Sequence, residues 1–244
     1  MAIFKRKNTD ETKKHPFVSA LIVAAGNATR MQGIDKQFLE LDGVPVLLRT
    51  VMEFANSPWI QEIVIATKEE NIPIVFSMLK EYNVPKIKDI VCGGKTRADS
   101  VVSALQRVSK ESEWVAIHDG ARPLVTSQVI ETTLHKAFEY GAAATGVKVK
   151  DTIKQVNQEQ QIVSTPERST LWAVHTPQIF KTIDYKNALA TVPNSQNFTD
   201  DCKLMEEAGT PVYMVEGSYE NIKITTPEDI ILAEAILKGR KNHD

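Results

Sequence analysis

The stretch SALIVAAGNATRMQGIDK, residues 19–36, begins with an apolar run, reaches Gly26, and continues into a polar loop that carries Arg30 and Lys36. A short apolar run that stops at a glycine is typical of a buried strand in a parallel sheet. Ligands of such sheets bind beyond the carboxyl ends of the strands, which is where this loop begins. We therefore expect the loop to face a ligand, and its two cations predict a phosphate.

The same pattern, an apolar run followed by a segment with helical periodicity, recurs along the chain. Buried strands are also expected at residues 60–67, 87–94 and 113–120, with a further strand at 142–149. Helices are expected at residues 45–57, 74–82, 97–108 and 127–140. This order predicts an α/β fold with a Rossmann-like, mostly parallel sheet and helices on both faces.

The C-terminal part resumes the alternation after an interruption. Thr199 and Thr226 each precede a helical pattern, and threonine is a favoured N-cap because its hydroxyl accepts a hydrogen bond from the first turn. Pro227 suits the first helical position. The further elements expected here are helices near 183–191, within 199–209 and at 226–237, and strands at 211–217 and 221–225.

Residues 149–170 break this rhythm. Alternating residues at 149–153 lead to a turn rich in glutamine and asparagine, and a short apolar return follows at 162–163. The pattern predicts a β-hairpin arm, at about 148–170, that is too polar to be buried by itself. Either it docks on a second subunit or it is a solvated flap, and the residues alone leave both open.

The organisation of the chain is otherwise simple. Residues 1–16 are basic and polar without a following apolar core, so we interpret them as a flexible extension rather than a secretory signal. No internal repeat or linker interrupts the remainder. We expect a single domain over residues 17–240, with the arm as its one projection.

Composition excludes several classes of partner. Lys and Arg total 29 against 31 Asp and Glu, so no general positive field attracts nucleic acid or anionic lipid. The chain has no apolar run of about 18 residues that would span a membrane. The two cysteines, Cys92 and Cys202, form no metal or disulfide pattern, which favours free thiols in a reducing, cytoplasmic location. The scattered histidines predict no zinc site.

Small residues and charges gather at the predicted carboxyl ends of the strands. Glycine N–H groups can cradle phosphates, and arginine and lysine supply the positive charge that phosphates require. Together they predict a nucleotide site, although glycines after strands are often only turns. Asp119 is either a ligand for Mg²⁺ or a turn aspartate. The three segments are Ala24-Ala25-Gly26, Gly93-Gly94 with Arg97, and His118-Asp119-Gly120-Ala121-Arg122.

Common nucleotide motifs do not account for this loop. It lacks the GxxxxGK[ST] string and does not fit GxGxxG, so neither a P-loop protein nor a dinucleotide-dependent oxidoreductase is favoured. A non-catalytic nucleotide-binding or scaffold protein is a further alternative. Binding of NAD(P)H, or binding of a nucleotide without turnover, would identify these two classes.

Eight motifs follow one another along the chain: AAGNATRM, DKQFLELDGVPVLLRTV, GGKTRADSV, HDGARP, VKDTIK, ERSTLWAVHTPQIF, TDD and VEGSYENIKITTPEDIILAEAIL. In this order they resemble the motifs of a family, the 2-C-methyl-D-erythritol 4-phosphate cytidylyltransferases of the non-mevalonate isoprenoid pathway. The resemblance runs from about Ser19 to Leu237. It implies transfer of CMP from CTP to 2-C-methyl-D-erythritol 4-phosphate, with release of pyrophosphate and with Mg²⁺ as cofactor.

The resemblance also implies a role for each matching residue. Arg30 and Lys36 would stabilise the transition state at the α-phosphorus of CTP, and Asp119 with Arg122 would lie between the nucleotide and the sugar phosphate, Asp119 on the metal side. The cytosine and ribose would be lined by Ala24, Ala25, Gly26, Gly94 and Ser100. The methylerythritol phosphate would be held by Thr152, Arg168, Thr176 and Lys223, with Arg168 and Lys223 orienting its phosphate for attack.

Two features of the resemblance concern assembly and specificity. In the family the arm is exchanged in a homodimer, which would bring Thr152 and Arg168 to the active site of the partner. The main alternative is a sister enzyme that acts on ribitol 5-phosphate. The residues Cys202-Lys203 slightly favour this alternative, whereas ERSTLW and HDGARP favour methylerythritol phosphate. The chain departs from the usual pattern at Ala28, Lys95, His175 and Cys202.

Overall fold

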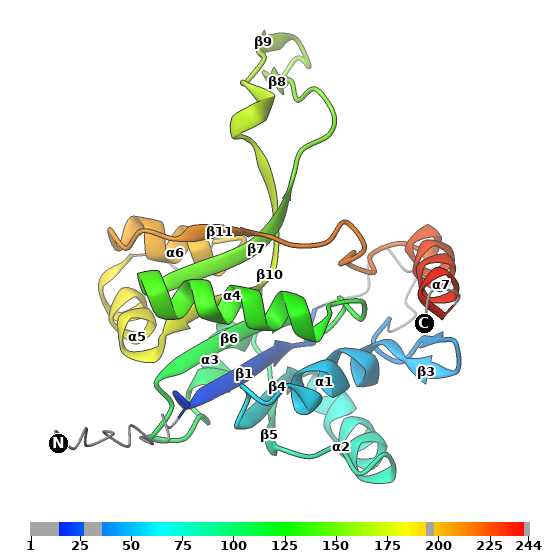
Figure 1. Ribbon diagram of the computed structural model, residues 1–244. Helices are drawn as coiled ribbons and strands as arrows, with labels where there is room; N and C mark the ends of the chain where they lie inside the picture. Colours follow the sequence, from blue (N-terminus) through cyan, green and yellow to red (C-terminus); the bar gives the residue numbers. More distant parts are fainter. Residues whose placement is uncertain (1–14, 27–35, 194–197, 242–244) are drawn as a thin grey trace, which may run out of the picture.

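The computed structural model describes residues 15–26, 36–193 and 198–241, and its core is one seven-stranded sheet in the order β11-β7-β10-β6-β1-β4-β5 (Figure 1). β10 is antiparallel to β6 and β7, and the other neighbouring pairs are parallel. The α/β fold with a mostly parallel sheet is therefore confirmed. The strands are β1 (Val18–Val23), β4 (Glu62–Thr67), β5 (Ile87–Cys92), β6 (Trp114–Asp119), β7 (Ala142–Lys148), β10 (Trp172–Lys181) and β11 (Tyr213–Glu216).

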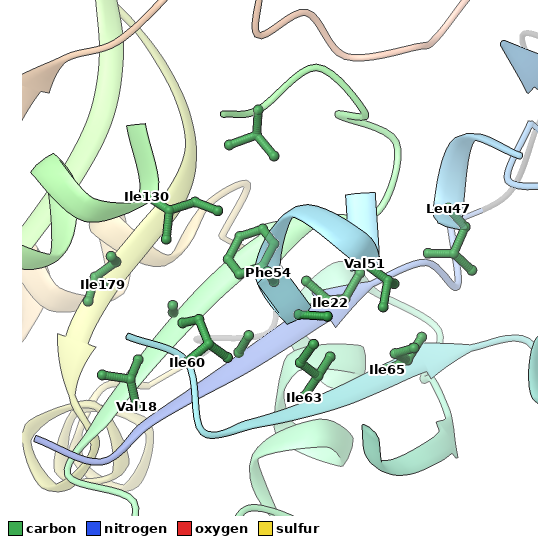
Figure 2. Packing of buried hydrophobic residues seen from close by; sticks show 14 of the residues in the cluster. Val18, Ile22, Leu47, Val51, Phe54, Ile60, Ile63, Ile65, Ile130 and Ile179 are labelled. Atoms are coloured by element: carbon green, nitrogen blue, oxygen red, sulfur yellow. The ribbon is translucent and has the colours of Figure 1, made fainter. Parts of the chain in front are cut away.

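Helices cover both faces of this sheet, as predicted. β1 is central and buried along its whole length, and its alternate residues serve two separate cores. Figure 2 shows the first core, in which Ile22 of β1, Ile63 of β4 and Phe54 of α1 belong to one cluster. The helices are α1 (Val46–Asn56), α2 (Ile72–Glu81), α3 (Arg97–Leu105), α4 (Ser127–Tyr140), α5 (Thr182–Thr191), α6 (Asp201–Glu207) and α7 (Pro227–Lys241).

The two cores contain different helices. The first takes buried residues from α1, α2 and α4, and the second takes them from α3, α5 and α6. A smaller cluster joins α7 to a two-stranded sheet of β2 (Glu40–Leu41) and β3 (Val44–Pro45), and Ile224 lies within it. Because both faces of the sheet are covered, its carboxyl edge remains the place where polar groups can meet a ligand.

Three local predictions were wrong. β5 is an edge strand with partly exposed residues rather than a buried strand, because only β4 pairs with it. Residues 221–225 form no strand; the N–H of Ile224 instead donates to the carbonyl of Ala121, at 2.8 Å. The N-cap of α6 is Asp200 rather than Thr199, and its carboxylate accepts from the N–H of Lys203 at 3.1 Å.

The hairpin at 149–170 projects from the sheet as predicted (Figure 1). Its tip pairs β8 (Gln155–Val156) with β9 (Ile162–Ser164) in an antiparallel ladder, and the short helix η3 (Arg168–Thr170) follows. Ile162 and Val163 are 59% and 55% exposed. The arm thus presents apolar side chains that the described part of this chain does not cover.

Candidate active site

A pocket of about 550 Å³ opens at the carboxyl edge of the sheet, and we call it the edge pocket. Residues at or just beyond the ends of β1, β4, β5 and β6 line it, together with Lys36 and the segment before α7. This is the place expected for a ligand in such a sheet. Seven of the predicted site residues line the pocket: Ala25, Gly26, Lys36, Gly94, Ser100, Asp119 and Lys223.

The turn from β5 to α3 forms one wall of the pocket. A Cβ atom added to Gly94 would overlap the side chain of Asp99, and one added to Gly93 would overlap Ala25, so both positions require glycine. Thr96 caps α3: its hydroxyl accepts from the N–H of Asp99, and the Asp99 carboxylate accepts from the N–H of Thr96, both at 3.0 Å. The helix therefore begins at the pocket, where its N-terminus favours an anion.

Ser100 joins this turn to the helix. Its hydroxyl accepts from the N–H of Gly94 at 3.1 Å and donates to the carbonyl of Thr96 at 3.0 Å. The side chain is 2% exposed, so its place in the pocket wall is fixed. Small residues on both sides of the wall leave room for a flat group to approach the backbone.

Asp119 ends β6 at the floor of the pocket and is 7% exposed. Its Oδ1 accepts from Arg97 Nε at 3.1 Å, and its Oδ2 lies 2.8 Å from Lys223 Nζ and 3.8 Å from Arg122 Nε. Burial alone would raise the pKa of Asp119, but Arg97, Lys223 and Arg122 outweigh it and hold that pKa well below its usual range. Asp119 is therefore a carboxylate at neutral pH.

Thr176 and Arg122 lie behind the pocket floor rather than in its lining. The Thr176 hydroxyl accepts from the N–H of Asp119 at 3.1 Å and lies 3.0 Å from His118 Nδ1. Arg122 donates from Nη1 to the carbonyl of Asn221, at 2.7 Å, which links the loop after β6 to the segment that carries Lys223. Both residues are buried, so they support the groups that face the pocket.

His118 is fully buried among these residues and is a packed core histidine. Burial lowers its pKa to about 3. The ring is therefore neutral at physiological pH. Ala24 is also buried, and its N–H donates to the carbonyl of Ala66 at 2.7 Å rather than toward the pocket.

The remaining predicted residues lie elsewhere. Thr152 and Arg168 are exposed residues of the projecting arm, and Arg168 Nη1 donates to the carbonyl of Lys150 at 3.0 Å. Neither lines the edge pocket of its own chain. Arg30 and Ala28 lie outside the described residues.

Sequence reasoning missed part of the surroundings of the pocket. Arg97 was predicted to add positive charge for a phosphate; it lines the pocket, and its contact with Asp119 was not predicted. Asp201, buried at the start of α6, pairs with Arg97 at 2.6 Å; its only sequence signal is the TDD motif. Lys68, Glu69 and Glu70 at the rim also had no signal, because they follow β4 without a recognisable motif.

The described residues contain neither a cluster of metal-ligating side chains nor a helix that could span a membrane. Within residues 15–26, 36–193 and 198–241, no group of three or more His, Cys, Asp or Glu side chains could hold a metal ion. Over the same residues, no helix is both long enough and apolar enough to cross a membrane.

A parallel-sheet edge that combines a glycine turn, a helix N-terminus and clustered cations indicates a nucleotide-binding protein, and the sequence relatives of this chain are nucleotidyltransferases. The family model of the 2-C-methyl-D-erythritol 4-phosphate cytidylyltransferases matches residues 18–239, and the chain belongs to this family. A relative of that name from Clostridium botulinum (strain Langeland) is 46% identical over 224 residues, which are 90% of this chain and 97% of that protein.

Other relatives and solved structures agree. The cytidylyltransferase of that name from Caldanaerobacter subterraneus subsp. tengcongensis is 44% identical, over 91% of this chain and 99% of that protein. The 4-diphosphocytidyl-2C-methyl-D-erythritol synthase from Anaerococcus prevotii matches with a TM-score of 0.80 and 32% identity, over 92% of this chain and 97% of that one. The cytidylyltransferase from Thermus thermophilus matches with a TM-score of 0.74 and 31% identity, over 91% of this chain and 99% of that one. These matches favour methylerythritol phosphate over ribitol 5-phosphate as the acceptor.

Proposed function

We propose that the edge pocket binds CTP and that the chain transfers its CMP group to 2-C-methyl-D-erythritol 4-phosphate, in the cytoplasm. The products are the CDP-alcohol and pyrophosphate. The observation that carries this proposal is Asp119, a buried carboxylate held by Arg97, Lys223 and Arg122 at the end of β6, in a pocket that the Gly93-Gly94 turn also lines.

The chemistry requires positioning more than proton transfer. The second pKa of a phosphate monoester is about 6, so the acceptor is mostly a dianion at neutral pH and attacks without a general base. The neutral, buried His118 agrees with this. The obstacle is the approach of one anion to another, and cations in a preorganised pocket reduce it.

Each cation has a proposed part. Lys36, which lines the pocket, and Arg30 would stabilise the charge that develops at the α-phosphorus of CTP. Lys223 would orient the acceptor phosphate. The Lys223 side chain is 37% exposed while it pairs with Asp119, so it can exchange this carboxylate for an incoming phosphate.

The nucleoside end of CTP would lie against the glycine turn. Ala25, Gly26 and Gly94 offer backbone and little side chain, which suits a small pyrimidine, and Ser100 offers a fixed hydroxyl. Ala24 is buried and would support this wall rather than line the pocket. Arg122 and Thr176 would hold Asp119 and the segment around Asn221 in place.

Mg²⁺ fits the pocket as a partner of Asp119 and the nucleotide phosphates. Mg²⁺ is usually bound by one or two carboxylates plus substrate phosphates, and one buried carboxylate at the pocket floor meets this pattern. When bound, the ion would supply charge neutralisation at the triphosphate. Asp119 would hold it, and Arg97 would keep the carboxylate in place.

The arm would complete the active site of a second subunit. Its apolar Ile162 and Val163 are exposed and would be buried by contact with a partner. Thr152 and Arg168 do not line the pocket of their own chain. In a homodimer these two polar residues would hold the acceptor phosphate bound to the partner. Sedimentation equilibrium should then give twice the 27.2 kDa of one chain.

Mixing two inactive variants tests the exchange of the arm. Arg168→Ala and Lys36→Ala dimers should each be nearly inactive. After subunit exchange, mixed dimers contain one intact site, so about a quarter of wild-type activity should return. If the mixture stays as inactive as its parents, the arm serves its own chain and this part of the proposal is wrong.

Product analysis tests the reaction itself. The purified chain is mixed with CTP, Mg²⁺ and methylerythritol phosphate, and the products are identified by mass spectrometry. We expect the CDP-alcohol and pyrophosphate in equal amounts. Failure to form any nucleotidyl product, with folded protein and bound CTP, would leave only a nucleotide-binding role.

A further inference from the structure

Asp201 sits at the centre of a buried polar network next to the edge pocket. The residue is 3% exposed, and its Oδ2 accepts from Arg97 Nη1 at 2.6 Å. Its Oδ1 accepts from the hydroxyl of Tyr185 at 2.6 Å, and its backbone N–H donates to Gln178 Oε1 at 3.0 Å. Both carboxylate oxygens are thus engaged, which fixes the orientation of the carboxylate.

Arg97 joins this network to the pocket floor. Its Nη1 binds Asp201 while its Nε binds Asp119, at 3.1 Å, so the planar guanidinium bridges two buried carboxylates. Burial acts against the charged form of Arg97, but Asp201 and Asp119 outweigh it and raise its pKa above the usual value. Its Nη2 is buried and has no hydrogen-bond partner among the described residues. Because Arg97 also lines the pocket, its orientation matters to any ligand there.

Tyr185 holds the far end of the network. Its ring stacks on Phe180, with ring centroids 5.4 Å apart, and only its hydroxyl contacts Asp201. Burial and the neighbouring Asp201 raise the pKa of Tyr185, so the hydroxyl stays protonated and donates. A phenylalanine at this position would keep the stacking and remove the donor alone.

We propose that Asp201 and Tyr185 are positioning residues, which act through Arg97 to hold Asp119 in the orientation that binds the nucleotide. The inference rests on the proposed function and extends it to α5 and α6. An arginine with one anionic partner can pivot, whereas one held between two carboxylates keeps its planar fork fixed. Without Asp201, Arg97 would be free to turn toward the triphosphate or to swing about Asp119.

The geometry separates the two substrates. Arg97 lines the pocket beside the glycine turn, which is the proposed nucleotide end, whereas the acceptor phosphate is assigned to Lys223 and to the partner's arm. Lys223 shares Asp119 with Arg97 but does not itself contact Asp201 or Tyr185, so loss of the network should weaken CTP binding much more than the affinity for the alcohol phosphate. General loosening of the fold would affect both.

Two single variants test this, with one control. Tyr185→Phe and Asp201→Asn should each raise the Kd for CTP about tenfold, as expected when a hydrogen bond to a charged group is lost. The Kd is measured by calorimetry, and the KM for methylerythritol phosphate should stay within about twofold. Glu207→Gln removes one carboxylate from the same helix, breaks an exposed pair with Lys203, and does not touch Arg97 or Gln178. It should bind CTP as the wild type does.

The double variant Tyr185→Phe/Asp201→Asn gives the decisive comparison. Because Tyr185 acts through Asp201, the double variant should bind CTP no more weakly than Asp201→Asn alone. Additive losses, equal changes in both substrates, or an unchanged Tyr185→Phe would overturn the inference. If the wild type binds CTP but forms no product, the proposed function fails, and the calorimetric comparison still decides the role of the network.

Discussion

Lys223→Gln should separate catalysis from stability. In the free protein Lys223 pairs with Asp119 at 2.8 Å, but its side chain is 37% exposed, and the carboxylate keeps Arg97 at 3.1 Å. Loss of such a partly exposed pair costs at most about 1 kcal/mol in the free energy of unfolding. If Lys223 orients the attacking phosphate, turnover should fall much further, by roughly a hundred- to thousandfold, as when other preorganised charges are removed.

Initial rates of pyrophosphate release at saturating CTP, with methylerythritol phosphate varied, measure the catalytic effect. Urea denaturation measures the free energy of unfolding. Lys241→Gln is a matched control, because Lys241 pairs with Asp42 on the surface and does not line the pocket. A kcat/KM for Lys223→Gln within about threefold of the control would refute the assigned role, since a preorganised charge contributes far more.

The remaining predictions concern the transition state, the glycine turn and acid stability. Lys36→Gln should lower kcat by about a hundred- to thousandfold in the pyrophosphate assay, whereas Lys80→Gln, exposed on α2, should not. Gly94→Ala should weaken CTP binding measured by calorimetry, because its methyl group would overlap the Asp99 side chain and displace the turn or the start of α3 that lines the pocket; wild-type affinity would show that this turn does not form the nucleotide site. Burial lowers the pKa values of His118 and His175 to about 3 and about 4, so below pH 6.5 the unfolded chain binds protons that the folded chain does not. As the pH falls below about 6.5, the free energy of unfolding should decrease, and His118 should contribute about 1.4 kcal/mol of this decrease per pH unit. Urea denaturation of His118→Gln at several pH values should show a decrease without this contribution.

The central part of the fold could be predicted because its sequence signals are local. The run that forms β1 is apolar on both faces, and both faces are covered by helices. The run that forms β6 ends in Asp119, and this abrupt change from apolar to charged residues identified the carboxyl end of a strand and hence the pocket floor.

Elements whose stability depends on distant partners could not be predicted in the same way. β10 carries buried polar residues, Thr176 and Gln178, which break the apolar pattern of a core strand and bind β6 and α6 instead. Residues 221–225 have alternating isoleucines, but Ile224 packs with α7 and bonds to Ala121 outside any ladder.

The candidate site shows the same difference between residues with local sequence signals and residues that depend on distant partners. Gly94, Ser100 and Asp119 belong to short motifs next to strand ends, so the sequence placed them together correctly. The pair of Arg97 and Asp201 joins residues 104 positions apart, and no pattern within either segment indicates the other. Resemblance to the family supplied the TDD motif but assigned no role to its second aspartate.

The choice of acceptor is the central claim, and one competition experiment tests it most directly. The purified protein is given limiting CTP, Mg²⁺ and equal concentrations of methylerythritol phosphate and ribitol 5-phosphate, and both CDP-alcohols are quantified by mass spectrometry. We expect the methylerythritol product in large excess, with little product of either kind when the metal is chelated. Excess of the ribitol product would contradict the assignment of this site.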